Sequence, residues 1–425
     1  MEHKAYPNIG EDLYSATLPN GLRLCVVPKP GFRSAFAVLA VRCGGAYRRF
    51  SLDGERYQVP AGVAHYLEHK MFDLPDGDDA LERLTSNGAD HNAFTADDIT
   101  CYHFECAGNF YEDLRLLLHL VCTPYFTEET VQKEQGIIAQ EILEDRDDPV
   151  SVLYDRMLRQ LYAGHPIRDR ILGTVESIRQ ISAQTLELCY RAFYTPRNMV
   201  LCVAGDLDPA EVERIAREEL PETGDDPAAV DFGPEEGMDP AEPFHREEMD
   251  VSAPQFLIGV KIAPSPTGEA RLRQRLTASL ALRLLLGSSS PFYQRLYAQG
   301  LLDRDFGAEL DFSAGTGSLL LGGESRDPEA VLRELRKELE QISREGFDPG
   351  RFERAKRASL GARLRGLEDF ESLCLALAED LFVGYCPLDA AALLPQIQKE
   401  DCEAFLRDAL LPERLALSII APRRT

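Results

Sequence analysis

The sequence predicts an α+β protein made of two domains of similar plan. Its 425 residues suit two to three domains with substantial cores. In both halves, strand-like apolar runs are mixed with long helical periodicities. A stretch rich in proline, glycine and acids divides the chain near its middle. Two such repeats joined by a flexible linker would close on each other like a clamp, with a cavity between them.

The first domain is predicted to cover residues 1–220. Its helical periodicities place apolar residues on one face every three to four positions, and its apolar runs are typical of buried strands. The predicted strands are Leu22–Lys29, Ser34–Gly44 and Met199–Pro209, the last running toward a helix that begins near Pro209. The predicted helices are Ala61–Phe72, Tyr111–Val121 and Glu128–Glu144.

The linker is predicted at residues 221–244 and the second domain at 245–425. The linker holds five Pro, three Gly and eight acids without a Lys or Arg, so it buries too little apolar surface to offset its ordering cost. The second domain repeats the plan of the first. Its predicted strands are Gln255–Pro264 and Leu415–Pro422, and its predicted helices are Ala270–Leu286, Pro328–Arg344 and Asp348–Glu368.

Charge and cysteine content exclude several function classes. The net charge of −25 repels phosphate backbones and anionic lipid surfaces, so we expect neither nucleic-acid nor membrane binding. No apolar run reaches the length of a membrane span, and the first residues, MEHKAYPNIGEDLYS, lack the apolar core of a secretory signal. The ten Cys form no CxxC pair and lie mostly in apolar runs. We therefore expect reduced core thiols in a cytoplasmic protein.

The motif that carries chemistry is His65-Tyr66-Leu67-Glu68-His69. Positions four apart share a helix face, so His65 and His69 can present two imidazoles to one ion, and neutral imidazoles are good ligands for Zn²⁺. Glu68 projects toward the same region. This is the H-x-x-E-H order, the inverse of the commoner H-E-x-x-H. The alternative is a helix whose surface carries these residues without function.

A catalytic zinc site needs a third protein ligand and an open position for water. The best candidates lie on the predicted helix Glu128–Glu144, where Glu134 and Glu141 are seven residues apart and share roughly one face. From spacing alone either carboxylate could be the ligand and the other a supporting group. A solvated face is the usual interpretation of a single helical Glu.

The motifs VAHYLEH and VQKEQGIIAQEI resemble those of the M16 (pitrilysin/insulysin-type) metallopeptidases, the inverzincins. The likeness continues in LPNGLRLCVVPKPG, the NAFT segment and HPIRDRILGTVESI. It is closer still to the short bacterial branch of paired active and inactive subunits, similar to the M16-like proteins associated with modification of elongation factor P. The resemblance implies two homologous M16-type domains, each a mostly antiparallel sheet packed with helices.

The resemblance also implies roles for individual residues. His65, His69 and Glu141 would ligate one Zn²⁺ per chain, Glu68 would act as the general base, and Glu134 would support a ligating His. In the family, the segment matching Asn87–Thr95 leads into an edge strand beside the zinc, to which a substrate peptide adds as an extra strand. The candidate substrate-binding residues are therefore Asn92, Ala93, Phe94 and Thr95, with an ordinary hairpin as the alternative.

One departure from the family concerns the second half. Many relatives carry an Arg and a Tyr in a pattern like R-x-x-x-G-L-x-Y, which bind the substrate carbonyl. Anchoring on Gly300-Leu301 places Leu296 and Asp303 at these positions. A homodimer, though possible, would not repair the loss. We therefore expect a heterodimer in which a related subunit without H-x-x-E-H supplies the Arg/Tyr pair.

The sequence thus predicts a cytoplasmic zinc metalloendopeptidase subunit that acts on peptides or unfolded segments in an enclosed chamber. A second hypothesis is a non-catalytic zinc-binding scaffold or processing partner, which the presence of Glu68 disfavours. A third, a redox or iron protein using the cysteines, lacks ligand spacing. Mn²⁺ or Co²⁺ could occupy the same ligands as Zn²⁺.

Overall fold

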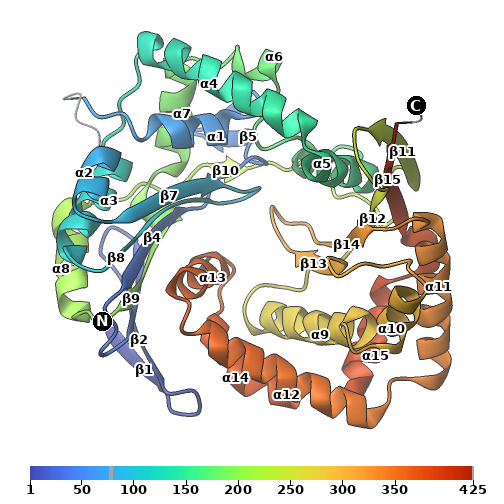
Figure 1. Cartoon of the computed structure of the whole chain (residues 1–425). Coiled ribbons are helices and arrows are strands. Elements are labelled where there is room, and N and C mark those ends of the chain that lie inside the picture. The colour runs from blue at the N-terminus through green and yellow to red at the C-terminus, as the bar shows by residue number, and fades with distance from the viewer. Residues whose placement is uncertain (76–79, 424–425) are drawn as a thin grey trace. The chain divides into compact units, whose positions relative to one another are not determined.

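The computed structural model describes residues 1–75 and 80–423, which fold as two compact units (Figure 1). Each unit combines a β-sheet with packed helices, which confirms the predicted α+β class. Unit 1 comprises Met1–Ile142, Arg170–Phe232 and Arg363–Leu388, and unit 2 comprises Leu143–Asp169, Gly233–Ala362 and Asp389–Thr425. These units follow packing rather than sequence repeats, and the domain boundaries given above stay a prediction.

Unit 1 is built on a seven-stranded sheet in the order β1-β2-β3-β9-β4-β8-β7. Strands β3 and β9 pair in parallel, and the other neighbours pair antiparallel. A small sheet has the order β10-β5-β6. The strands are β1 (Glu2–Tyr6), β2 (Glu11–Thr17), β3 (Arg23–Pro28), β4 (Ala35–Val41), β5 (Arg49–Leu52), β6 (Glu55–Gln58), β7 (Asp90–Thr95), β8 (Thr100–Cys106), β9 (Met199–Gly205) and β10 (Ala229–Val230).

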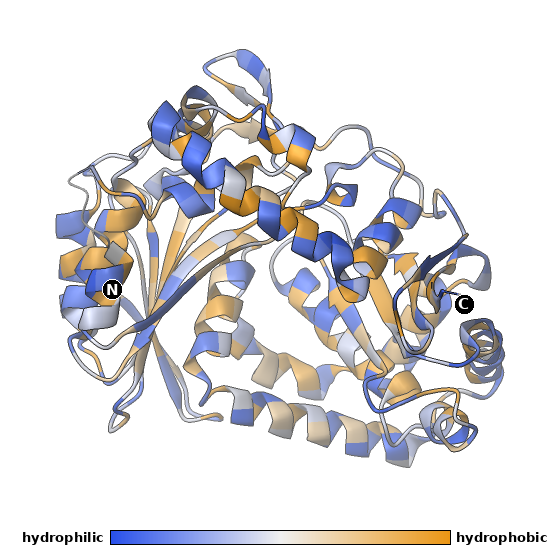
Figure 2. Cartoon of the chain, turned by 45° about the horizontal axis from the view of Figure 1, so that its top comes forward, coloured by the Kyte–Doolittle hydropathy of each residue, from blue (hydrophilic) through white to orange (hydrophobic). Residues whose placement is uncertain are grey.

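The core of unit 1 lies on its central strands. Every residue of β4 and of β9 is buried. In Figure 2 the colour separates the hydrophobic segments of the sheets (orange) from hydrophilic segments on the helices (blue). A continuous apolar strand is expected where helices cover both faces of a sheet. The helices of unit 1 are α1 (Val63–Lys70), α2 (Ala80–Ser86), α3 (Phe110–Cys122), most of α4 (Glu128–Asp147), α6 (Val175–Ile178), α7 (Ala183–Phe193), α8 (Pro209–Glu219) and α13 (Phe370–Phe382).

Unit 2 is built on a five-stranded sheet in the order β11-β15-β12-β14-β13. Its strands are β11 (Phe244–Met249), β12 (Gln255–Lys261), β13 (Gly307–Asp311), β14 (Ser318–Glu324) and β15 (Ala416–Pro422). Its helices are α5 (Pro149–Leu161), α9 (Glu269–Leu286), α10 (Pro291–Ala298), α11 (Pro328–Glu345), α14 (Ala390–Leu393) and α15 (Lys399–Ala409), while α12 (Pro349–Gly366) crosses the division between the units. Short 3-10 turns lie at Pro166–Arg168, Pro196–Asn198, Pro387–Asp389, Leu394–Gln396 and Pro412–Arg414.

The two sheets share one topology. In unit 1 the order β3-β9-β4-β8-β7 begins with a parallel pair and continues antiparallel, and β11-β15-β12-β14-β13 does the same in unit 2. The strands follow the same chain order in both. This match confirms two domains of one plan and aligns the α1 region of unit 1 with α9 and α10 of unit 2.

Each half of the sequence contributes one helix to the sheet that the other half forms. Helix α13, from the C-terminal half, packs on β4 and β9, and α5, from the N-terminal half, packs on β12 and β15. In unit 1 Phe370, Leu373 and Leu377 of α13 join one buried cluster with Phe36 and Val38. The sequence does not predict this exchange of helices, because hydrophobic periodicity does not indicate which sheet a helix covers.

The predicted linker is anchored to both units by contacts in its middle part. Strand β10 pairs with β5 in unit 1. In unit 2 the Glu236 carboxylate accepts backbone N–H groups from Ala163, Gly164 and His165 at 2.9, 2.6 and 2.7 Å. Lys261 Nζ lies 3.2 Å from the same carboxylate. These hydrogen bonds and this charge outweigh burial and lower the pKa of Glu236 to about 2.

The predicted strands and helices are found with small shifts at their ends. Residues 2–17 form the antiparallel hairpin of β1 and β2, which the sequence pattern did not predict. No helix within residues 1–75 and 80–423 combines the length and the apolar character needed to cross a membrane.

Candidate metal centre

Helix α1 presents its two histidines side by side. Their ring centroids lie 4.6 Å apart. Gly62 precedes the helix with φ of 92°, and a Cβ there would lie 2.6 Å from the Leu172 carbonyl oxygen, so glycine is required. Val63, Tyr66 and Leu67 bury the remaining faces, which fixes the direction in which the imidazoles point.

Helix α4 places its carboxylates opposite these histidines. Val131, Ile138 and Ile142 are its buried residues. Glu141 Oε1 lies 3.5 Å from His65 Nε2, and Glu141 Oε2 lies 3.6 Å from His69 Nε2. One ligand atom each from His65, His69 and Glu141 falls within 4.8 Å of the others. Two imidazole nitrogens and one carboxylate oxygen at this spacing fit a zinc ion with an open fourth position.

Glu134 and Glu141 have different partners. Glu134 Oε1 lies 2.9 Å from His69 Nδ1, so it accepts the Nδ1 proton and leaves the Nε2 lone pair facing Glu141. The hydrogen bond to His69 lowers the pKa of Glu134. The buried Nδ1 of His65 has no hydrogen-bond partner among the described residues. The supporting carboxylate therefore acts on one histidine only.

The side chain of Glu68 is buried beside this donor set but is not one of the three donors. The residue is 6% exposed, and burial raises the pKa of its carboxyl group. Thr95 Oγ1 donates a hydrogen bond to Glu68 Oε2 at 2.6 Å. For His69, burial opposes the charged ring, but the hydrogen bond to Glu134 and the nearby carboxylates raise its pKa in the absence of metal.

The candidate substrate-binding residues all lie in β7, at the edge of the unit 1 sheet. Helix α1 packs against β7 (Figure 1). Asn92 Oδ1 accepts the backbone N–H of Ala93 at 2.9 Å. Beside this strand lies a cavity of about 690 Å³, whose lining includes Glu68, His69, Phe72, Asn92, Ala93, Tyr125, Lys133 and Glu134. An open strand edge next to a polar cavity offers main-chain groups to an extended peptide.

Two other histidines near the sheet have structural contacts. His91 Nε2 lies 3.1 Å from the Thr85 hydroxyl. The ring of His103 is tilted against that of Phe36, with centroids 5.3 Å apart, and burial lowers its pKa. Neither belongs to a group of metal-donor atoms within the described part of the chain.

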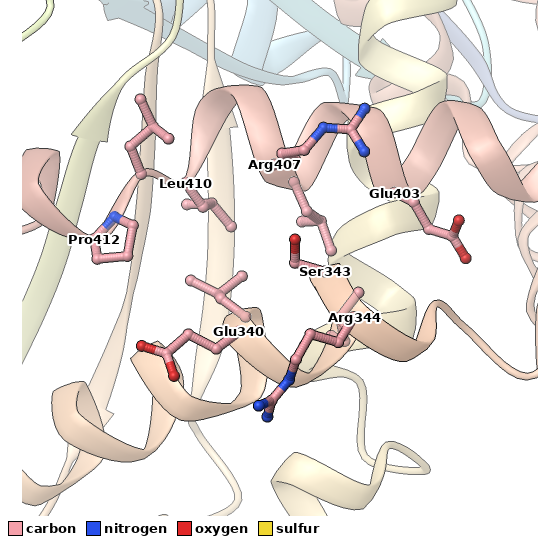
Figure 3. A pocket seen from close by; sticks show the side chains of 11 residues that line it. Glu340, Ser343, Arg344, Glu403, Arg407, Leu410 and Pro412 are labelled. Carbon is pink, nitrogen blue, oxygen red and sulfur yellow. The ribbon is translucent and has the colours of Figure 1, made fainter.

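Unit 2 has a hollow of a different kind. It lies between α11 and α15, has a volume of about 380 Å³, and is drawn in Figure 3. Its lining combines leucines with the charged side chains of Glu340, Arg344, Glu403 and Arg407. It contains no histidine or cysteine, so it does not offer the donor set of unit 1.

Two contacts of the site were not predicted from the sequence. The Tyr66 hydroxyl donates to the Val131 carbonyl oxygen and ties α1 to α4. The Thr95 hydroxyl ties β7 to Glu68. Tyr66 lies inside the motif, but its partner is 65 residues away, so only the fold reveals the contact.

Comparisons with known proteins are consistent with this geometry. Residues 53–175 match the family model described as Insulinase (Peptidase family M16), and residues 180–359 match that described as Peptidase M16 inactive domain. The chain is 34% identical over 427 residues to a Bacillus subtilis protein described as uncharacterized zinc protease YmfH, covering 98% of each.

Solved structures give the same result. An M16-like peptidase from Alicyclobacillus acidocaldarius superposes with a TM-score of 0.93 at 33% identity, over 99% of this chain and 100% of that one. A protease from Helicobacter pylori superposes with a TM-score of 0.82 at 19% identity, covering 96% and 99% of the two chains, and this likeness concerns the fold.

Proposed function

The chain belongs to the M16 family and is a zinc protease, and from this premise we propose that it is the metal-bearing subunit of an endopeptidase. Its substrates are peptides or unfolded segments that enter an enclosed chamber. The observation that carries the proposal is the placement of His65, His69 and Glu141 around one point, with the buried Glu68 beside them. One Zn²⁺ per chain would be held by these three residues.

Each residue has a distinct task in this proposal. When bound, Zn²⁺ supplies Lewis acidity that polarises the scissile carbonyl and lowers the pKa of water. Glu68 takes a proton from the attacking water and delivers it to the leaving amine nitrogen. Glu134 holds the tautomer and orientation of His69.

Strand β7 binds the substrate through its open edge in this proposal. Main-chain hydrogen bonds give affinity that tolerates many sequences, because every peptide offers the same N–H and C=O groups. Asn92, Ala93, Phe94 and Thr95 form this edge beside the cavity. This arrangement supports a preference for extended chains over folded proteins.

The second half supports a paired-subunit assembly. Leu296, which aligns with the family arginine, is fully buried in α10. Arg295 is held by Glu338 at 2.9 Å, and Tyr297 stacks on Tyr293 with ring centroids 5.6 Å apart. Both side chains, which flank Leu296 in the sequence, are thus engaged within this chain, which disfavours them as replacements for the missing donors. We therefore place the chain in the short bacterial branch, with a related subunit supplying the Arg/Tyr pair.

The cytoplasm is the proposed location. All ten cysteines carry free thiols, and eight of them are buried. Burial raises the pKa of Cys43, Cys101 and Cys374, which disfavours the reactive thiolate. Such thiols suit a reducing compartment.

The test is peptide cleavage by zinc-loaded protein, alone and with a related M16-type subunit that lacks the H-x-x-E-H motif. Glu68→Gln should keep one zinc per chain and lose turnover, because the amide cannot accept the proton. Cleavage that requires the partner would support the split site. Stoichiometric zinc without cleavage under any condition would favour a non-catalytic zinc-binding scaffold.

A further inference from the structure

The proposed general base has a single defined contact. Among the described residues, the Glu68 side chain makes one hydrogen bond, which its Oε2 accepts from Thr95 Oγ1 at 2.6 Å. Glu68 lies on α1, and Thr95 is the last residue of β7. This contact joins the helix that carries the base to the strand where we expect the substrate.

The protons of this contact can be assigned. A hydroxyl has one proton to donate, and an ionised carboxylate only accepts, so Thr95 is the donor to Glu68. Thr100 Oγ1 donates to the Cys43 carbonyl oxygen at 2.9 Å, which uses its own proton. Thr100 therefore cannot donate to Thr95, and its oxygen, 3.4 Å from Thr95 Oγ1, is a far weaker acceptor for the Thr95 proton than the Glu68 carboxylate at 2.6 Å.

The donor is itself held firmly. Thr95 pairs with Thr100 across the β7–β8 hairpin, and its branched side chain has few rotamers. The turn that follows is pinned by Gly45 N–H to the Ala96 carbonyl at 2.9 Å. At Gly44 a Cβ would lie 2.3 Å from the same oxygen, so the backbone packs there without a side chain.

We propose that Thr95 is a positioning residue that fixes the carboxylate of Glu68 and keeps it in register with the substrate-binding edge of β7. The inference rests on the proposed function, because it assumes that Glu68 is the base. Under this proposal Thr95 supports Glu68, the proton acceptor, instead of contacting the substrate. Such supporting hydrogen bonds orient reactive groups without touching substrate.

The experiment compares Thr95→Val, which replaces the hydroxyl by a methyl of the same shape, with Thr95→Ser, which keeps it. In the assay in which the wild type is active, Thr95→Val should lower kcat about 10–100-fold. KM should stay within about twofold, because the main chain of β7 is unchanged. Thr95→Ser should restore most of kcat. Zinc content should equal that of the wild type in both variants.

A readout independent of activity is the position of Glu68. A crystal structure of Thr95→Val should show its carboxylate moved from the wild-type position, whereas Thr95→Ser should retain it. Thr100→Val is the matched control, since it removes a neighbouring hydroxyl that donates elsewhere. Its kcat should stay near that of the wild type. If Thr95→Val does not fold, Thr95→Ala takes its place as the variant without the hydroxyl group.

Several outcomes would overturn the inference. Wild-type kcat in Thr95→Val, with Glu68→Gln inactive, would remove Thr95 from the mechanism and leave the proposed function intact. Equal losses in Thr95→Val, Thr95→Ser and Thr100→Val would indicate hairpin packing instead. Loss of zinc in Thr95→Val would place its effect on the metal site. Wild-type activity in Glu68→Gln would instead reject the proposed function itself.

Discussion

Units 1 and 2 carry the same five-strand framework but different helices between its second and third strands in chain order. In unit 1 this segment includes α1, with His65, Glu68 and His69. In unit 2 it is α9, which consists mainly of leucine, alanine and arginine, and α10, with the sequence PFYQRLYA. No histidine occurs after His245 in the sequence. The shared strands therefore determine where a site can lie. Whether a metal site is present depends on a few side chains of α1 and α4.

The helix exchange gives the largest predicted effect. Residues 1–220 expressed alone lack α13, so the apolar face of β4 and β9 is left uncovered. We expect this fragment to unfold without a cooperative transition, measured by urea titration with circular dichroism. Co-expression with residues 221–425 should restore the transition. A stable, cooperative fragment 1–220 would mean that the sequence repeat is also the folding unit.

Removing the metal ligand His69 should abolish zinc binding, the chemical property that distinguishes unit 1 from unit 2. His69→Ala should reduce zinc from about one ion per chain to near zero after dialysis, because two donors remain. Metal analysis of the purified protein measures this. His119→Ala is the control. His119 lies on α3, close to the Thr123 hydroxyl, and does not belong to the donor set. Retained zinc in His69→Ala would contradict the assigned ligands.

A smaller effect is expected from the carboxylate that supports His69. Glu134→Gln keeps an acceptor for the Nδ1 proton but loses the charge, so zinc affinity should fall about 10–100-fold. Competition with a chelator measures the affinity. Glu129→Gln, exposed in the first turn of the same helix, should leave it unchanged. Equal affinities in the two variants would show that Glu134 does not act on the metal.

The smallest predicted effect concerns Glu236, the linker residue whose carboxylate binds backbone N–H groups of unit 2. Glu236→Gln should lower the free energy of unfolding by about 1.5 kcal/mol at neutral pH, because hydrogen bonds to a charged acceptor are weakened. The folded pKa of Glu236, about 2, lies below its ordinary value of 4.5. Its stabilisation is therefore complete above pH 4.5 and is lost as the pH falls toward 2.

The variant should accordingly show a shallower loss of stability over that acidic window. Urea unfolding at several pH values measures it, and Glu235→Gln, the exposed neighbour, is the control. An unchanged pH dependence would mean that the backbone contacts of residues 163–165 do not depend on the charge.

Local pattern predicted the helices and strands well. α1 and α4 were located because their apolar residues recur at helical spacing, and β4, β9 and β12 because they are continuous apolar runs. The site residues lie together where the motif placed them, but the spacing left Glu134 and Glu141 interchangeable. The structure separates the two carboxylates, because Glu141 approaches the Nε2 atoms of His65 and His69 whereas Glu134 contacts Nδ1 of His69.

The parts that were missed depend on distant partners. Thr95 belongs to an ordinary strand sequence until its hydroxyl is seen against Glu68. Glu236 is one of eight acids in the linker, and its sequence neighbours do not show that three backbone N–H groups surround it. The destination of α13 is likewise set by the sheet face left open in unit 1.

The position of α13 in the chain also has a consequence during synthesis. Strands β3, β4 and β9 have all left the ribosome soon after residue 205, yet the helix that covers their shared face begins at Phe370. At typical elongation rates this interval lasts on the order of ten seconds or more. During that time the nascent sheet exposes an apolar surface suited to chaperone binding, and the metal-bearing unit completes its core only after α13 has been synthesised.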